Sequence, residues 1–156
     1  MVFNLDTVRS RMKTIGCKEF PVILESEIKE LAVSRYFLSS SFGGSAFEVF
    51  PNIGEDWIRK HGMNDFMYLN PDFQPIAPGI PGGGALWIDV EPADLQGNPP
   101  DSKIDFSQMK RVFSRMKPNE WQFVGMYRVK PADPPYLTAE EWKLQGANVC
   151  LYDSVA

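Results

Sequence analysis

Residues 109–130 read MKRVFSRMKPNEWQFVGMYRVK, and this stretch decides the fold class. Two runs rich in aromatic and β-branched residues, Arg111 to Met116 and Trp121 to Lys130, flank the short polar stretch from Lys117 to Glu120. Such a pattern predicts a β-hairpin. Because a single hairpin is only marginally stable in water, we expect it to belong to a small twisted sheet, antiparallel or mixed.

Strict alternation along the second arm assigns its side chains to two faces of the sheet. One face would carry Trp121, Phe123, Gly125, Tyr127 and Val129, and the other Gln122, Val124, Met126, Arg128 and Lys130. A glycine in mid-strand marks a bulge or a place where another group approaches the backbone closely. Gly125 is therefore expected to be such a place.

Helical patterns lie on both sides of this hairpin. Leu5, Val8, Met12 and Ile15 recur at helical spacing and predict a first amphipathic helix that ends at Gly16. A second helix is predicted from Ser26 to Leu38. Near the other end, the Thr138 and Glu141 spacing is that of a capping box and predicts a short helix. The fold class is accordingly α+β, with N-terminal helices and a short C-terminal helix.

The segment from Phe50 to Gly84 is dense in proline and glycine. This composition predicts a long structured loop, followed by a strand from Ala85 to Val90. The triplet Gly82 to Gly84 precedes a strand and not a helix, so it lacks the helix N-terminus that lets a glycine-rich loop hold phosphate. We expect it to be a tight or flexible turn.

Length and composition point to one domain over residues 1–156, since 44% of its 156 residues are hydrophobic and 23% are charged. No apolar run approaches the roughly 20 residues that a membrane span needs, so no membrane partner is expected. Two cysteines are too few for a disulfide framework. These features indicate an intracellular protein, nuclear or cytoplasmic.

Positive charges gather in the hairpin region although the net charge is −4. The candidate phosphate-binding residues are Lys110, Arg111, Arg115, Arg128 and Lys130. A solvated surface without a partner is an equally open interpretation of the same charges.

The only histidine, His61, stands near Asn64 and Asp65. This group offers a titratable ring, an amide and a carboxylate, which suit either ligand binding or general acid/base chemistry, with Asp65 orienting the ring. Asn and Asp in loops also cap turns, and that structural role stays open. Of the aromatic residues, Trp87, Phe123 and Tyr127 are candidates for stacking on a planar ligand. One histidine with scattered carboxylates does not predict a metal site, and no cofactor is expected.

Three groups of motifs carry a family resemblance: SRYFLSSSFGG from Ser34, KHGMNDFMYLN from Lys60, and the ordered series RVFSRM, EWQFVGMYRV and LTAEEW. Together they resemble an uncharacterised domain family abundant in mushroom-forming fungi. The resemblance covers roughly Val33 to Gln145, and it implies no particular activity.

A second, local resemblance does imply one. RVFSR followed by WQFVGMYRV is similar to the strand pair around the Tyr-Asp-Gly motif of SRA domains, which flip out and bind modified cytosine. The motif here reads Phe123-Val124-Gly125. The resemblance implies a partly closed β-barrel with helices against it, and a loop with His61, Asn64 and Asp65 beside the base pocket.

Three functions follow as hypotheses. The leading one is a non-catalytic nucleic-acid-binding module, a reader of a modified base in DNA. The first alternative is a small enzyme that acts on a polar or nucleotide-like substrate through His61, and the second is a protein-interaction domain.

Overall fold

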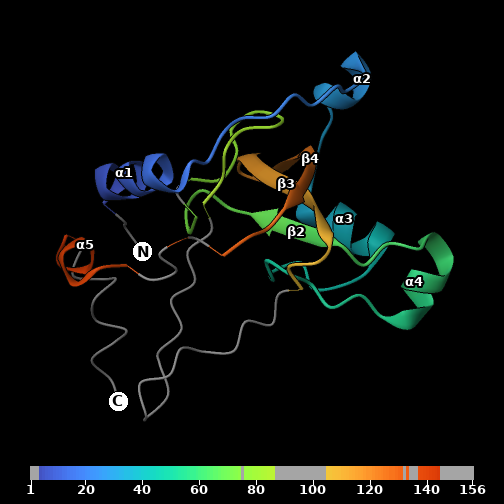
Figure 1. Ribbon diagram of the computed structural model, residues 1–156. Coiled ribbons are helices and arrows are strands. Elements are labelled where there is room, and N and C mark those ends of the chain that lie inside the picture. The colour runs from blue at the N-terminus through green and yellow to red at the C-terminus, as the bar shows by residue number, and fades with distance from the viewer. Residues whose placement is uncertain (1–3, 75, 87–104, 132, 134–136, 145–156) are drawn as a thin grey trace, which may run out of the picture.

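The computed structural model describes residues 4–74, 76–86, 105–131, 133 and 137–144. Its centre is an open four-stranded sheet with the strand order β1-β4-β3-β2 (Figure 1). The strands are β1 (Ala32–Val33), β2 (Phe66–Leu69), β3 (Met109–Lys117) and β4 (Glu120–Arg128). β2 pairs with β3 in parallel, whereas the other pairs are antiparallel. The α+β class is confirmed, with a mixed sheet. The barrel that the SRA resemblance implies is not closed by the strands described.

The predicted hairpin is confirmed as β3 and β4. Its turn at Lys117 to Glu120 contains Asn119 with φ 61°. Asn tolerates this left-handed conformation better than most residues, because its short side chain hydrogen-bonds locally. The turn chemistry is thus readable from the sequence.

The prediction that β4 alternates regularly along its length is wrong. The register shifts so that Val112 faces Gly125 while Phe113 faces Phe123, which leaves Val124 as the extra residue of a bulge. The bulge that Gly125 predicts is confirmed. The φ angle of Gly125 is 133°, a conformation that residues with a side chain rarely adopt, which explains why a glycine stands there. Because one extra residue exchanges the two faces, Tyr127 lies on the opposite face from Phe123.

α1 (Leu5–Ile15) is confirmed together with its predicted end at Gly16, and the structure adds an N-cap at Asn4. The Asn4 side chain accepts a hydrogen bond from the Thr7 amide, and Gly16 ends the helix in the left-handed conformation. α5 (Ala139–Lys143) is confirmed too, with Thr138 and Glu141 bonded reciprocally as a capping box.

The predicted second helix from Ser26 to Leu38 is wrong. The segment forms the short α2 (Ser26–Lys29), then β1, then α3 (Arg35–Phe42). Ser34 starts α3 by accepting a hydrogen bond from the Phe37 amide. Ala32 and Val33 pair with β4 instead of continuing a helix, because a long-range strand partner outweighs weak local helix propensity.

The loop predicted from Phe50 to Gly84 is wrong where it contains α4 (Glu55–His61) and β2. All four residues of β2 are buried, and their partner β3 lies more than 40 residues later in the chain, so local composition gives no sign of the pairing. His61 consequently ends a helix instead of lying in a loop. In the strand predicted from Ala85 to Val90, Leu86 forms a bridge with Ile76, and residues 87–90 lie outside the described part of the chain.

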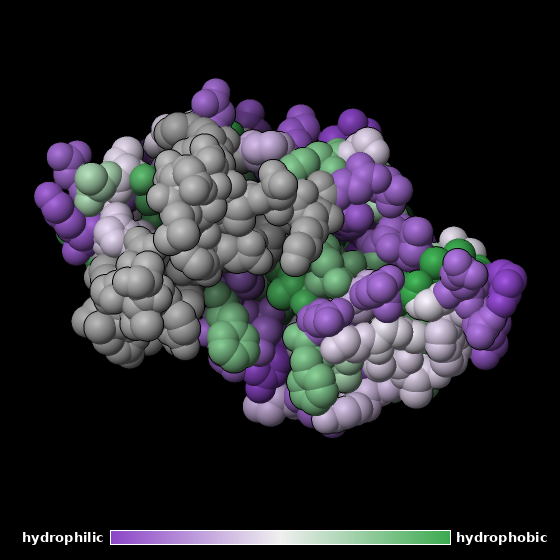
Figure 2. Space-filling view, turned by 90° about the horizontal axis from the view of Figure 1, so that it is seen from below, coloured by the Kyte–Doolittle hydropathy of each residue, from purple (hydrophilic) through white to green (hydrophobic). Residues whose placement is uncertain are grey.

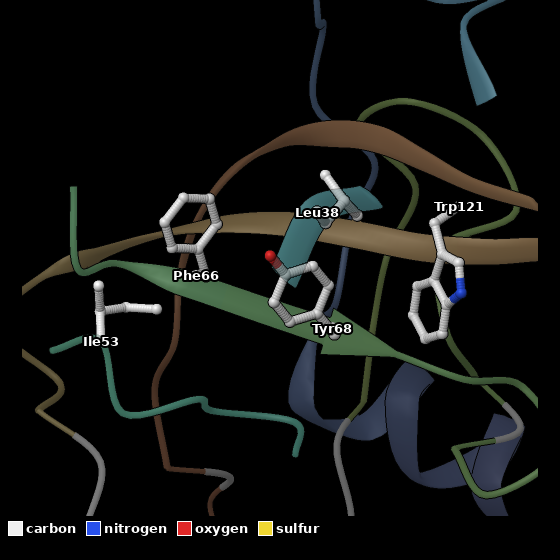
Figure 3. Packing of buried hydrophobic residues seen from close by; sticks show 5 residues of the cluster. All are labelled: Leu38, Ile53, Phe66, Tyr68 and Trp121. Atoms are coloured by element: carbon white, nitrogen blue, oxygen red, sulfur yellow. The ribbon is translucent and has the colours of Figure 1, made fainter. Parts of the chain in front are cut away.

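The two faces of the sheet have different covers. α3 and α4 contribute to the first face, whose buried cluster is drawn in Figure 3: Leu38, Ile53, Phe66, Tyr68 and Trp121. The second face carries Met67, Leu69, Val112 and Val124, packed against residues of the loops that precede β2 and follow it. Among the described residues, the partners of this cluster from outside the hairpin lie in coil or bend: Val49, Phe50, Ala77 and Ala85.

α1 and α5 lie together at one end of the molecule (Figure 1). Val8 of α1 packs against Ile76, Leu86 and Trp142. The guanidinium of Arg11 lies 2.8 Å from the carboxylate of Glu141, and its side chain is only 7% exposed. The two ends of the described chain are thereby joined. None of the helices described is long and apolar enough to cross a membrane.

Candidate binding site

A pocket of about 370 Å³ lies beside the end of β4, within the size range of ligand pockets. Its walls include five apolar or aromatic residues: Phe20, Ala85, Met109, Met126 and Tyr127. Two cations, Lys18 and Arg128, line the same pocket, and no carboxylate stands among the described residues of its lining. The pocket therefore combines apolar walls with positive charge.

Gly82 fixes one wall of the pocket by joining the segment of residues 17–22 to β4. The Phe20 amide donates a hydrogen bond to the Gly82 carbonyl (2.9 Å), and the Gly82 amide donates to the Val124 carbonyl (2.8 Å). Gly82 has φ 75°, and a Cβ atom there would lie 1.9 Å from the Phe20 carbonyl oxygen. Only glycine allows this close approach.

Tyr127 is held in the pocket wall by three contacts. Its hydroxyl donates to the Gly83 carbonyl at 2.9 Å, and its ring meets Phe20 edge to face at 4.7 Å between centroids. The bulged Gly125 lies underneath, where a Cβ atom would be 3.4 Å from the Tyr127 ring. Burial raises the pKa of Tyr127 from the ordinary 10.0 to about 12, which extends the pH range over which the phenol is a neutral donor.

Lys18, Arg128 and the nearby Lys130 are exposed, and none of them forms an ion pair with a described carboxylate. Other arginines of the sheet differ: Arg111 pairs with Asp65 at 3.4 Å and Arg115 with Asp72 at 2.5 Å. Cations without an internal partner keep their charge available for an anionic ligand. Arg128 and Lys130 are accordingly exposed cations of the hairpin without a described acidic partner, whereas Lys117 pairs with Glu120 at 3.5 Å.

A family model described as a domain of unknown function, DUF6697, matches residues 32–151. The chain belongs to the DUF6697 family. The expectation of an uncharacterised family is thus confirmed. No curated protein and no solved structure matches the chain.

The DUF6697 region supplies β4 and the Gly84–Ala85 side of the pocket, whereas Cys17, Lys18 and Phe20 precede it. Sequence reasoning missed these three residues together with Met109 and Met126. The bulge glycine was the available signal, since Val22 of the same preceding segment would lie 3.1 Å from a Cβ at Gly125. A glycine in mid-strand predicts that another segment comes close to the backbone, but it does not identify that segment.

Only part of the predicted phosphate-binding set is free to bind. Arg111 lies over the Phe66 ring and pairs with Asp65, and Arg115 bonds Asn70 and Asp72. Lys110 is 8% exposed. It pairs with Tyr127 and lies with it on the second face of the sheet, opposite the face that carries Arg111. The structure thus joins Asp65 to Arg111, two residues predicted for different roles, and leaves Arg128 and Lys130 at the surface.

His61 uses both ring nitrogens within the fold. Its Nε2 lies 2.9 Å from the Phe42 carbonyl oxygen and its Nδ1 accepts from the Met63 amide at 3.1 Å, so Nε2 carries the proton. Asn64 is exposed, and the carboxylate of Asp65 is directed to Arg111. A general acid/base role for His61 stays a prediction, and it would require one of these bonds to open.

The three aromatic residues predicted to stack on a ligand do not lie together in the described structure. Tyr127 lines the pocket, whereas Phe123 packs on Phe113 at 5.5 Å, on the other face of the sheet. Trp87 lies outside the described residues. Within the ranges that the structure describes, no three His, Cys, Asp or Glu side chains form a group that suits a metal ion.

A second polar arrangement lies inside the core. Arg35 is 6% exposed, and its guanidinium carbon stands 3.3 Å from the centroid of the Tyr68 ring. Figure 3 shows that ring between Phe66 and Trp121. No described group bonds the Tyr68 hydroxyl, and burial raises its pKa to about 12 against a smaller lowering by Arg35 and Arg111. An unpaired buried hydroxyl costs stability.

We therefore expect Tyr68→Phe to equal the wild type in stability at pH 7 or to exceed it by up to about 1 kcal/mol. The folded-state pKa lies above the ordinary value of 10.0, so the wild type loses stability as the pH rises from 10 towards 12. At pH 11 the advantage of the variant should grow by about 1 kcal/mol. Urea titrations at both pH values measure it. A loss of stability at pH 7 beyond that of the exposed-site control Tyr36→Phe would mean that the hydroxyl is bonded.

Proposed function

We propose that the domain is a non-catalytic nucleic-acid-binding module, and that the pocket beside β4 holds one nucleotide. The observation that carries the proposal is the pocket lining itself. Phe20, Tyr127 and two methionines form most of its apolar part. Lys18 and Arg128 bring positive charge, and the described part of the lining contains no opposing carboxylate.

Each half of this lining matches one half of a nucleotide. A base has flat, weakly polar faces that pack well on aromatic rings, and the polarisable methionine side chain adapts to such a surface. A phosphate is bound by lysine and arginine side chains. The net charge of −4 works against broad electrostatic binding, so the affinity should depend on these few contacts.

The finer form of the proposal is a reader of a modified base. A base inside a duplex cannot enter a pocket, so the ligand is a single-stranded or extruded nucleotide. Of the positions that resemble the SRA motif, Val124 and Gly125 are buried and Phe123 packs on Phe113 on the first face. We therefore propose that the base stacks three residues after Val124 on the same strand, at Tyr127.

Arg128→Gln is expected to weaken binding of a fluorescent single-stranded oligonucleotide about tenfold, because one charged phosphate contact is lost. Fluorescence anisotropy at low and near-physiological salt measures the change. The slope of the logarithm of the binding constant against the logarithm of the salt concentration should become shallower by about 1, the value for one lost phosphate contact. The same titration with duplexes carrying unmodified, methylated or hydroxymethylated cytosine tests the finer proposal.

The matched control is Arg59→Gln, which removes another exposed arginine, on α4, whose described ion-pair partner is Asp56. It should bind as the wild type does. Equal affinity of Arg128→Gln and Arg59→Gln would remove the pocket from the proposal. Indifference to cytosine modification would reject the reader function and retain the binding module.

The enzyme alternative draws less support from the geometry, because both nitrogens of His61 bond within the fold. The protein-interaction alternative draws on exposed aromatic residues: Tyr36 is 64% and Phe47 86% exposed, and their rings touch edge to face. In the view from below, however, the hydrophobic residues at the surface lie in small groups between hydrophilic ones (Figure 2). Nucleotide binding therefore remains the function that the geometry favours.

A further inference from the structure

We infer that Lys18, which precedes the DUF6697 region, binds the phosphate of the nucleotide and makes the pocket selective for nucleotides over nucleosides. This inference rests on the proposed nucleotide pocket. It adds that the family region supplies only part of the site, and that Cys17, Lys18 and Phe20 from the preceding segment contribute the rest of the described lining.

The segment that carries Lys18 is held in place on both sides of this residue. On one side, the Cys17 thiol donates to the Ala85 carbonyl at 3.7 Å. On the other side, Phe20 bonds Gly82 through its amide and meets Tyr127 through its ring. A lysine between two fixed neighbours has its backbone placed before a ligand arrives, which reduces the ordering cost of binding.

α1 extends this anchoring to the far end of the family region. Arg11, which is only 7% exposed, forms an ion pair at 2.8 Å with Glu141 of α5, and Val8 packs beside Trp142. The helix ends at Gly16, directly before Cys17. The preceding segment is thus docked on the family region at two places, and its lysine belongs to the folded site.

The positions of two cations around the pocket are the basis for assigning Lys18 to the phosphate. Lys18 and Arg128 line the same pocket from two segments that are far apart in sequence, residues 17–20 and β4. Two cations around one pocket stabilise a dianionic phosphate better than one, whereas a neutral nucleoside gains nothing from them. Removing Lys18 should consequently reduce the affinity for a nucleotide and leave that for the matching nucleoside unchanged.

Isothermal titration of the full chain with deoxycytidine monophosphate and with deoxycytidine tests this. We expect the wild type to bind the nucleotide at least tenfold more tightly, Lys18→Gln to lose most of that preference, and Lys18→Arg to retain it. Lys13→Gln, which removes an exposed lysine of α1 near the same segment, should behave as the wild type does.

The outcomes separate this inference from the function on which it rests. If Arg128→Gln weakens nucleotide binding while Lys18→Gln leaves it unchanged, the pocket stands and the role of Lys18 is rejected. If the wild type binds neither the nucleotide nor a single-stranded oligonucleotide, the proposed function itself fails. Equal loss for nucleotide and nucleoside in Lys18→Gln would assign the lysine a structural role and overturn the inference.

Discussion

Gly82→Ala is expected to lower the free energy of unfolding by about 2–4 kcal/mol and to abolish nucleotide binding. The new Cβ would lie 1.9 Å from the Phe20 carbonyl oxygen, at a residue whose φ is 75°. The backbone must move to relieve this overlap, and the movement breaks the two hydrogen bonds that join Phe20 to Gly82 and Gly82 to Val124. Urea denaturation followed by tryptophan fluorescence measures the first effect, and the oligonucleotide titration the second.

Gly79 provides the matched control in the same loop, since a Cβ there would meet nothing within 4 Å. Gly79→Ala should change stability by less than about 0.5 kcal/mol, because it strains nothing and slightly restricts the unfolded chain. If both variants have the same stability and affinity, residues 17–22 do not lie against Gly82 as described, and the pocket loses one of its walls.

Arg35→Ala is expected to cost about 3 kcal/mol of stability. The guanidinium donates hydrogen bonds to the carbonyls of Ser45 and Glu48, at 2.5 and 3.3 Å, and stacks on the buried ring of Tyr68. Truncation removes these bonds and leaves a void beside the core of the first face. Chemical denaturation measures the loss.

Two further variants separate the causes of that loss. Arg35→Met keeps much of the volume without the hydrogen bonds, and Arg35→Lys keeps the charge without the planar fork that reaches two carbonyls while stacking. We expect both to fall between the wild type and Arg35→Ala. Arg59→Ala, at an exposed site, should change stability by less than about 0.5 kcal/mol. If Arg35→Ala is as stable as Arg59→Ala, the buried arginine contributes nothing to the packing of α3 on the sheet.

The features of the site differ in how far the sequence predicts them. Tyr127 and Arg128 were readable as candidates because they stand in a clear hairpin rich in aromatic and basic residues. Lys18 and Phe20 were not, since about a hundred residues separate them from β4 and no local pattern marks them. Arg111 and Arg115 looked equally suited to phosphate, and only the position of Asp65 and Asp72 shows that they are paired.

The sequence by itself determined what depends on neighbouring residues: the β3–β4 hairpin and its glycine bulge, α1 with its end at Gly16, the capping box of α5, and hence the α+β class. These features follow from side-chain spacing and backbone preference, which act over a few residues. Tertiary structure decided the rest. β1 and β2 are strands because they pair with strands far away in the chain. One extra residue at the bulge exchanges the two faces of β4. Gly82 hydrogen-bonds Phe20 and so brings a distant segment to the pocket. Such contacts depend on how the whole chain packs, so the sequence around each residue does not identify its distant partner.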